Sequence, residues 1–242
     1  MVHTRMSAIG WVVGGSETVV RALLDAVGPE GTLAAYASWE DHVYDAHDWP
    51  AEHRDAYLAA PPVFDPATAE AVREHGRIPE RVRTWPGAQA SAHPEANVVA
   101  VGARAEWLTR PHPADDAYGP DSPFARLDQV LLLGAPLETI TLLHHAEALA
   151  RAPKRRVTFC IPVVEDGRVA ERTYTDIDTS GAAYPYKTLG LEEDEFAVIA
   201  REALAAGIGL RAEVGRAHSH LFPARELTAF AVRWIEDRFG VG

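Results

Sequence analysis

A histidine and a glutamate lie three residues apart in a segment with helical periodicity. In residues 139–150, which read TITLLHHAEALA, His144 and Glu147 share one helix face. A neutral imidazole can take up a proton near neutral pH, and a carboxylate partner fixes its tautomer and stabilises its charged form. The spacing therefore suits a general base with an orienting acid. The alternative is a histidine with a purely structural role.

Two loop segments have the composition of ligand-binding loops. Residues 4–10 carry hydroxyl groups and a glycine between a short strand and a helix, a setting that can present backbone N–H groups to phosphate. Because this loop is neither a P-loop nor a GxGxxG motif, an ordinary turn is the alternative. In residues 91–94, the proline favours an extended conformation at His93. That conformation either orients the ring or marks a turn.

Residues 39–62 lose all periodicity and become acidic and aromatic. The segment begins with Trp39, Glu40 and Asp41, and Tyr44 follows three residues later. A long irregular insertion in a compact domain is often functional. Carboxylates pair with ammonium groups and aromatic faces cover rings, so the mixture suits a polycationic, hydroxyl-rich ligand. The alternative is a solvated acidic loop.

Several kinds of site and partner are disfavoured. The chain has no HExxH motif and no Cys/His cluster, so we expect no metal, and it has no G-x-S-x-G nucleophile elbow. Its one cysteine, Cys160, lies in an apolar run, and we expect a buried, inert thiol. The formal net charge of −12 disfavours nucleic acid as a partner and favours attraction of cations.

Strand-like and helix-like segments alternate along the chain, which indicates an α/β fold with a central mixed β-sheet flanked by helices. The Asp166-Gly167 dipeptide between two apolar segments is a strong hairpin signal. The predicted helices are residues 16–27, 65–75, 139–150, 192–206 and 223–238. The predicted strands are residues 32–37, 97–101, 129–134, 156–165, 168–176 and 208–214.

The size and composition suit one globular domain over residues 1–242, since 47% of the residues are hydrophobic and no linker is evident. No apolar run approaches the ~18 residues that a membrane span requires, and no signal peptide is recognisable. We therefore expect a cytoplasmic protein without a membrane partner, either a monomer or a homodimer.

The order of several segments resembles the aminoglycoside 3-N-acetyltransferase family, the antibiotic N-acetyltransferases that do not share the GNAT fold. The segments are VHTRMSAIG, GPEGTLAAYASW, PVFDPATAEA, RTWPGAQASAHPEANVVAVG, GPDSPFARL and VLLLG followed by TLLHHAEALA. Their shared order along nearly the whole chain makes the resemblance specific. The N-terminal helix and most of the first strand expected for the family are missing from this sequence.

The resemblance implies transfer of an acetyl group from acetyl-CoA, the cosubstrate, to the 3-amino group of a 2-deoxystreptamine aminoglycoside, which confers antibiotic resistance. It implies direct transfer without a metal or an acetyl-enzyme. The H-x-x-E pattern selects His144 over His145 as the general base. For the carboxylate that orients this base, Asp178 is preferred, Glu147 comes next, and Asp176 is a further candidate.

The resemblance also implies two sets of binding residues. Those on the CoA side are Thr4, Met6, Ser7, Ser91, His93 and Ser122. Those on the aminoglycoside side are Trp39, Glu40, Asp41, Tyr44 and Asp65.

Two other functions stay open at this point. One is an acetyl-CoA-dependent acetyltransferase for another amine, which the acidic and aromatic insertion disfavours. The other is a non-catalytic protein that binds the drug or CoA, which would need the pocket but no histidine paired with a carboxylate. A hydrolase is less well supported because the chain has no nucleophile motif.

Overall fold

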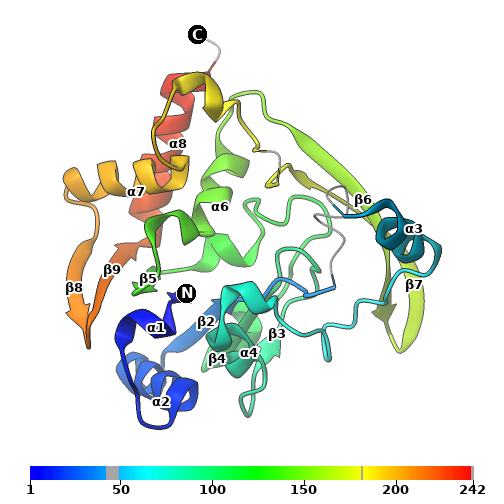
Figure 1. The fold of residues 1–242 in the computed structure, drawn as a ribbon, viewed down its shortest axis with the longest axis horizontal. Helices are drawn as coiled ribbons and strands as arrows, with labels where there is room; N and C mark the ends of the chain where they lie inside the picture. The colour runs from blue at the N-terminus through cyan, green and yellow to red at the C-terminus, as the bar shows by residue number, and fades with distance from the viewer. Residues whose placement is uncertain (42–48, 181, 241–242) are drawn as a thin grey trace.

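The computed structural model describes residues 1–41, 49–180 and 182–240 and shows a central sheet with helices on both sides (Figure 1). Within these residues the sheet has seven strands in the order β3-β4-β2-β1-β5-β9-β8. The strands are β1 Val2–Thr4, β2 Thr32–Tyr36, β3 Gln89–Ala90, β4 Val98–Gly102, β5 Gln129–Leu133, β8 Leu210–Val214 and β9 Ala217–Pro223.

The sheet is mixed, as expected from the sequence. The short central strand β1 runs parallel to both neighbours, β2 and β5, and the other strand pairs are antiparallel. The carboxyl ends of three parallel strands therefore meet at one edge of the sheet. In open α/β sheets this edge is where ligands bind.

Helices cover the two faces of the sheet because its strands alternate apolar side chains between them. In β2, Leu33 and Ala35 belong to one core cluster, together with residues of α2 and α4, whereas Ala34 belongs to the cluster formed with α5, α6, α7 and α8. The α-helices are α1 Met6–Ile9, α2 Gly15–Val27, α3 Ala51–Ala59, α4 Arg77–Arg83, α5 Ala105–Thr109, α6 Leu142–Leu149, α7 Glu195–Ala205 and α8 Ala224–Phe239. The 3-10 helices are η2 Arg73–His75, η3 Pro123–Arg126, η4 Leu137–Thr139 and η5 Tyr186–Leu189.

Two long strands, β6 Arg156–Glu165 and β7 Arg168–Ile177, form a separate hairpin beside α3 (Figure 1). The hairpin turns at Asp166 and Gly167, both with positive φ, as the sequence predicts. Its inner face contributes Ile161, Val163 and Tyr174 to a small core with Trp39 and Phe64. The outer face is exposed, so Cys160 is exposed as well, and the expectation of a buried thiol is wrong.

Two helical predictions need correction. Residues 65–75 do not form one helix: Asp65 accepts the backbone N–H of Ala67 in a local turn, and only the 3-10 helix at Arg73–His75 follows. The helix in this region is α4, which the sequence analysis does not predict. Asp65-Pro66 begins a turn as readily as a helix, because the Asp side chain satisfies backbone groups in either case.

Strand β9 and helix α3 were not predicted from the sequence. β9, which reads AHSHLFP, pairs with β5 along four residues and so belongs to the sheet interior. Its two histidines interrupt the apolar alternation by which strands are recognised. Helix α3 lies inside the expected irregular insertion and buries no residue, and its apolar residues show no helical periodicity.

Candidate active site

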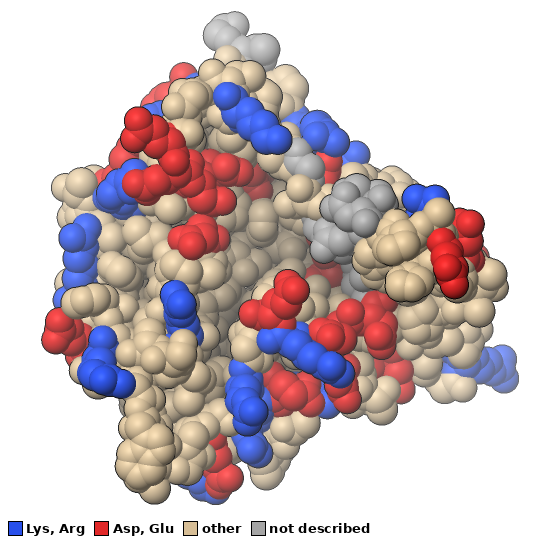
Figure 2. Space-filling model, viewed as in Figure 1, with Lys and Arg blue, Asp and Glu red and all other residues tan. Residues whose placement is uncertain are grey.

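A cavity of about 980 Å³ opens at the carboxyl edge of the parallel strands. Its walls come from β1, α1, the end of β2, η2 and the segment from η4 into α6. Figure 2 shows the hollow near the centre of this face, with acidic side chains gathered around it. The volume lies at the upper end of the range for small-molecule and cofactor sites.

His144 and Glu147 form the hydrogen-bonded pair that their spacing predicts. Nδ1 of His144 lies 2.7 Å from Oε2 of Glu147. The Glu147 side chain is 2% exposed, whereas that of His144 is 20% exposed and lines the cavity. Within the described part of the chain, Nε2 of His144 has no hydrogen-bond partner. The carboxylate therefore sets Nδ1 as the protonated nitrogen and leaves Nε2 to accept a proton.

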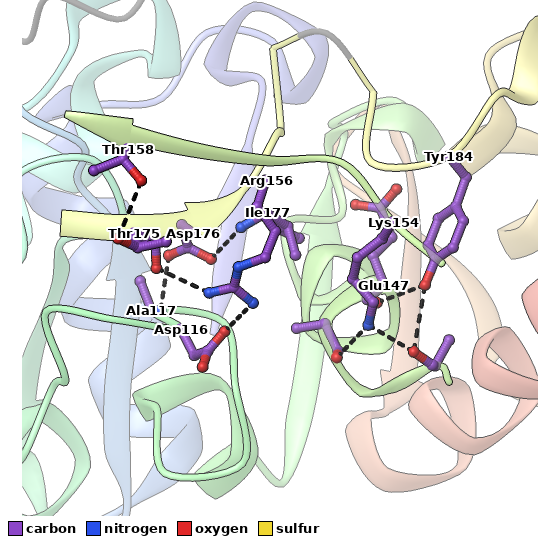
Figure 3. Close-up of polar contacts among 12 residues, drawn as sticks. Asp116, Ala117, Glu147, Lys154, Arg156, Thr158, Thr175, Asp176, Ile177 and Tyr184 are labelled. Atoms are coloured by element: carbon purple, nitrogen blue, oxygen red, sulfur yellow. Dashed lines mark hydrogen bonds and ion pairs between the residues drawn. The ribbon is translucent and has the colours of Figure 1, made fainter. Parts of the chain in front are cut away.

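Aromatic rings hold the His144 imidazole from two sides. The ring of Tyr118 lies 5.2 Å from it in a tilted arrangement, and that of Phe196 lies 4.8 Å away, edge to face. Both aromatic residues also line the cavity. The loop that carries Tyr118 is tied to the hairpin, because the carboxylate of Asp176 accepts the backbone N–H of Ala117 at 2.7 Å (Figure 3).

The preference for Asp178 as the orienting carboxylate needs correction. Asp178 forms an ion pair with Arg155 at 2.7 Å and accepts the hydroxyl of Ser180 at 3.1 Å. Asp176 is buried, accepts two backbone N–H groups, and has its pKa raised by burial to about 6. The acid on the His144 ring is Glu147, since it comes from the same helix turn.

The residues expected on the CoA side divide into two groups. Thr4, Met6 and Ser7 line the cavity. The other three, Ser91, His93 and Ser122, are 0% exposed, so this structure offers no surface of theirs to a ligand.

The buried group has clear internal contacts. The Ser91 hydroxyl accepts the backbone N–H of Val98 at 2.9 Å and lies 2.8 Å from Nδ1 of His112. The ring of His93 stacks on that of His112 at 5.1 Å. These contacts of Ser91 and His93 join the loop before β4 to the segment before η3. The contact of Ser91, His93 and Ser122 with CoA stays a prediction.

The residues expected on the aminoglycoside side are also divided. Trp39 and Glu40 line the cavity, and Glu40 accepts the backbone N–H of Arg73 at 2.7 Å. Asp41 and Asp65 are not among the described residues that line it. Tyr44 lies outside the described residues.

One buried acidic residue of the cavity escaped the sequence analysis. Glu95 is 3% exposed and lines the cavity; its Oε1 accepts the Thr179 hydroxyl at 2.9 Å. Its Oε2 is buried and has no hydrogen-bond partner among the described residues. Burial, followed by the charges of Asp176 and Asp178, raises the pKa of Glu95 to about 8. The available signal was a lone acid between Pro94 and a buried strand.

The described residues contain no cluster of histidine, cysteine and carboxylate groups suited to a metal ion. In the same part of the chain, no helix is both long and apolar enough to span a bilayer.

The mixed α/β fold, with an open cavity that carries a histidine–glutamate pair at its wall, is shared with solved structures of acyltransferases. The sequence profile of the family described as aminoglycoside 3-N-acetyltransferase matches residues 1–236. The chain belongs to this family of acyltransferases.

Individual relatives agree with this assignment. Aminoglycoside N(3)-acetyltransferase VII of Streptomyces paromomycinus is 51% identical over 247 residues, covering 99% of this chain and 86% of that protein. The solved structure of AAC-IIIb with CoASH is 43% identical, with a TM-score of 0.89, and covers 100% of this chain and 91% of that one. The structure of AAC-VIa bound to sisomicin is 38% identical, with a TM-score of 0.88 and the same coverage of both chains.

Proposed function

We propose that this protein transfers the acetyl group of acetyl-CoA to the 3-amino group of a 2-deoxystreptamine aminoglycoside, with His144 as the general base. The observation that carries the proposal is the His144–Glu147 pair at the wall of an acid-lined cavity. The CoA-bound relative AAC-IIIb and the sisomicin-bound relative AAC-VIa support the same pair of substrates.

The charge of the cavity favours a polycation. The described carboxylates that line it are Glu40, Glu74, Glu95 and Glu138, against two arginines, Arg5 and Arg77. Aminoglycoside amines are mostly protonated near neutral pH, and buried carboxylates pair with them most strongly where water is excluded. The unsatisfied oxygen of Glu95 makes it the best candidate for such a contact.

The cavity also suits the extended thioester cosubstrate. Thr4, Met6 and Ser7 lie at the end of β1 and in α1, where they line the cavity. The Oγ1 of Thr4 is buried without a hydrogen-bond partner among the described residues. This leaves it available for the polar groups of a bound acyl-CoA.

In the proposed reaction, Nε2 of His144 takes a proton from the 3-ammonium group. The nitrogen lone pair then attacks the thioester carbonyl carbon. The carbon–sulfur bond breaks, and the nitrogen releases its second proton to solvent as the neutral amide forms. CoA leaves as a thiolate and receives a proton from the imidazolium. Glu147 stabilises that imidazolium, and the cavity holds amine and thioester in contact.

One assay tests this function against the alternatives. The protein is mixed with acetyl-CoA and an aminoglycoside panel, thiol release is followed, and the acetylated position is determined by NMR. We expect drug-dependent thiol release and a 3-N-acetyl product. Release only with other amines would indicate an acetyltransferase for a different acceptor. Binding of CoA or drug without any release would indicate a non-catalytic binding protein.

A further inference from the structure

Behind the His144–Glu147 pair lies a buried tyrosine that the proposed chemistry does not use. Tyr186, at the start of η5, is 3% exposed, and its hydroxyl donates to Oε1 of Glu147 at 2.7 Å. Its ring packs against Trp234 and Phe239 of α8. The hydroxyl is therefore held in place by a part of the core that does not contribute to the cavity.

Both oxygens of Glu147 are thereby occupied by different partners. Oε2 lies at 2.7 Å from the His144 ring, and Oε1 accepts from Tyr186 at the same distance. A carboxylate with one partner can rotate about its last side-chain bond, whereas one with two partners on opposite oxygens is fixed in its plane. The alignment of the His144 ring depends on that plane.

We infer that Tyr186 is a positioning residue: it fixes the Glu147 carboxylate so that His144 presents Nε2 to the amine. The inference rests on the proposed role of His144, and it extends the pair to a chain of three side chains. Tyr186 is not among the described residues that line the cavity.

The surroundings of the Glu147 carboxylate keep the Tyr186 hydroxyl protonated, so that it acts as a hydrogen-bond donor. Burial and the neighbouring Glu147 charge, followed by Glu195, raise the pKa of Tyr186 far above its ordinary value, so it keeps its proton and donates it. The Lys154 ammonium binds the backbone carbonyls of Glu147, Ala148 and Ala150 at the end of α6 (Figure 3). Lys154 therefore fixes the main chain of Glu147, and Tyr186 fixes its side chain.

The chain offers a matched control two residues away. Tyr184 is 1% exposed, and its hydroxyl donates to the backbone carbonyl of Glu147 at 3.0 Å, not to the carboxylate (Figure 3). Tyr184→Phe therefore removes a hydroxyl that contacts the same residue, in the same layer of the core, without releasing the acid group. It should lower stability about as much as Tyr186→Phe does.

The first test compares the two variants in steady-state kinetics. Tyr186→Phe should lower kcat about tenfold, the loss expected for one hydrogen bond to a charged group. KM for both substrates should stay the same, and Tyr184→Phe should keep wild-type kcat. In the Glu147→Gln background, Tyr186→Phe should cause little further loss, because the two act as a unit. A full tenfold loss in that background, or wild-type kcat for Tyr186→Phe, would overturn the inference.

The second test does not depend on turnover. In ¹⁵N-labelled protein without substrate, the Nδ1–H signal of His144, assigned by its loss in His144→Ala, reports its bond to Glu147. Tyr186→Phe should shift or broaden this signal, whereas Tyr184→Phe should leave it in place. An unchanged signal in Tyr186→Phe would refute the positioning role. Activity retained by His144→Ala would refute the general base instead, so the two failures are distinguishable.

Discussion

The two sides of the cavity differ in how their polar groups are satisfied. On the α6 side, the contacts of His144 run through Glu147 to Tyr186, and every bond is short. On the side of β1 and η2, polar atoms of His3, Thr4, His75 and Glu95 are buried without hydrogen-bond partners among the described residues. All four of these residues line the cavity.

Under the proposed function, this difference separates the groups that carry out the chemistry from the groups that bind the ligands. A base must be aligned before the substrate arrives, so its partners are already in place. Buried polar groups without partners destabilise the empty protein, and a ligand that satisfies them recovers that free energy. Burial also lowers the pKa of His3 to about 3 and lowers that of His75, so both rings are neutral and can bond to uncharged polar groups.

The largest expected effect comes from removing the base. His144→Ala should lower kcat roughly 10²- to 10⁴-fold, since a positioned proton acceptor contributes about that much. Binding of CoA and of aminoglycoside, measured by calorimetry, should persist because the opposite side is intact. Undiminished turnover would show that another group, or water, removes the proton.

The next effect distinguishes the two carboxylates. Glu147→Gln should lower kcat about 10²-fold, because the amide cannot stabilise the imidazolium. Asp178→Asn should stay within about threefold of wild type, since its ion pair with Arg155 is partly solvent-exposed and worth little. Steady-state kinetics of the two variants show which carboxylate assists His144. Equal losses of kcat would restore Asp178 as the carboxylate that orients His144.

On the binding side, an ammonium group should displace the proton of Glu95 and bind its carboxylate. Glu95→Gln should therefore raise KM for aminoglycosides about tenfold, the loss of one charge-assisted bond. KM for acetyl-CoA should not change. Glu106→Gln on α5 is a suitable control, because that side chain is 77% exposed and pairs with Arg110. A drug KM equal to that of wild type would exclude Glu95 from the binding surface.

The same variant should change how stability depends on pH. The folded pKa of Glu95, about 8, exceeds its ordinary value of 4.5, so the folded state binds this proton more tightly than the unfolded state does. Stability should therefore fall as pH rises across that window, and Glu95→Gln should abolish this part of the loss. Thermal melts should show a gain on the order of 10 °C near pH 9 and none near pH 4.5. A pH-independent difference would contradict the pKa assignment.

The smallest effect is expected far from both sides. Cys160 lies on the exposed face of the hairpin and is absent from the cavity lining. Cys160→Ser should keep kcat and both KM values near wild type in the thiol-release assay, because direct transfer needs no acyl-enzyme. Loss of activity would bring a covalent route back into consideration.

The sequence predicted those elements that depend on residues close together in the chain. The hairpin follows from Asp166-Gly167, and the core of α6 with its His144–Glu147 spacing follows from helical periodicity. Strand β9 was missed because its pairing with β5 bridges residues about ninety positions apart in sequence. Long-range pairing overrides local propensity.

The site was predictable where the chain itself brings residues together. Glu147 is on the same helix turn as His144, so its contact follows from spacing alone. The burial of Ser91, His93 and Ser122 depends on how two separate loops pack, and a motif does not specify which side of a loop faces a ligand. Glu95 emerges as a site residue only once the sheet brings it to the cavity.

The exposed thiol of Cys160 has a practical consequence. It is the sole cysteine of the chain, so a maleimide dye should label the native protein at one defined position on the hairpin, without mutagenesis. A colorimetric reagent that counts CoA thiols should likewise count this side chain, one equivalent per chain. At high enzyme concentrations this background competes with the product signal, and Cys160→Ser is then the cleaner catalyst to measure.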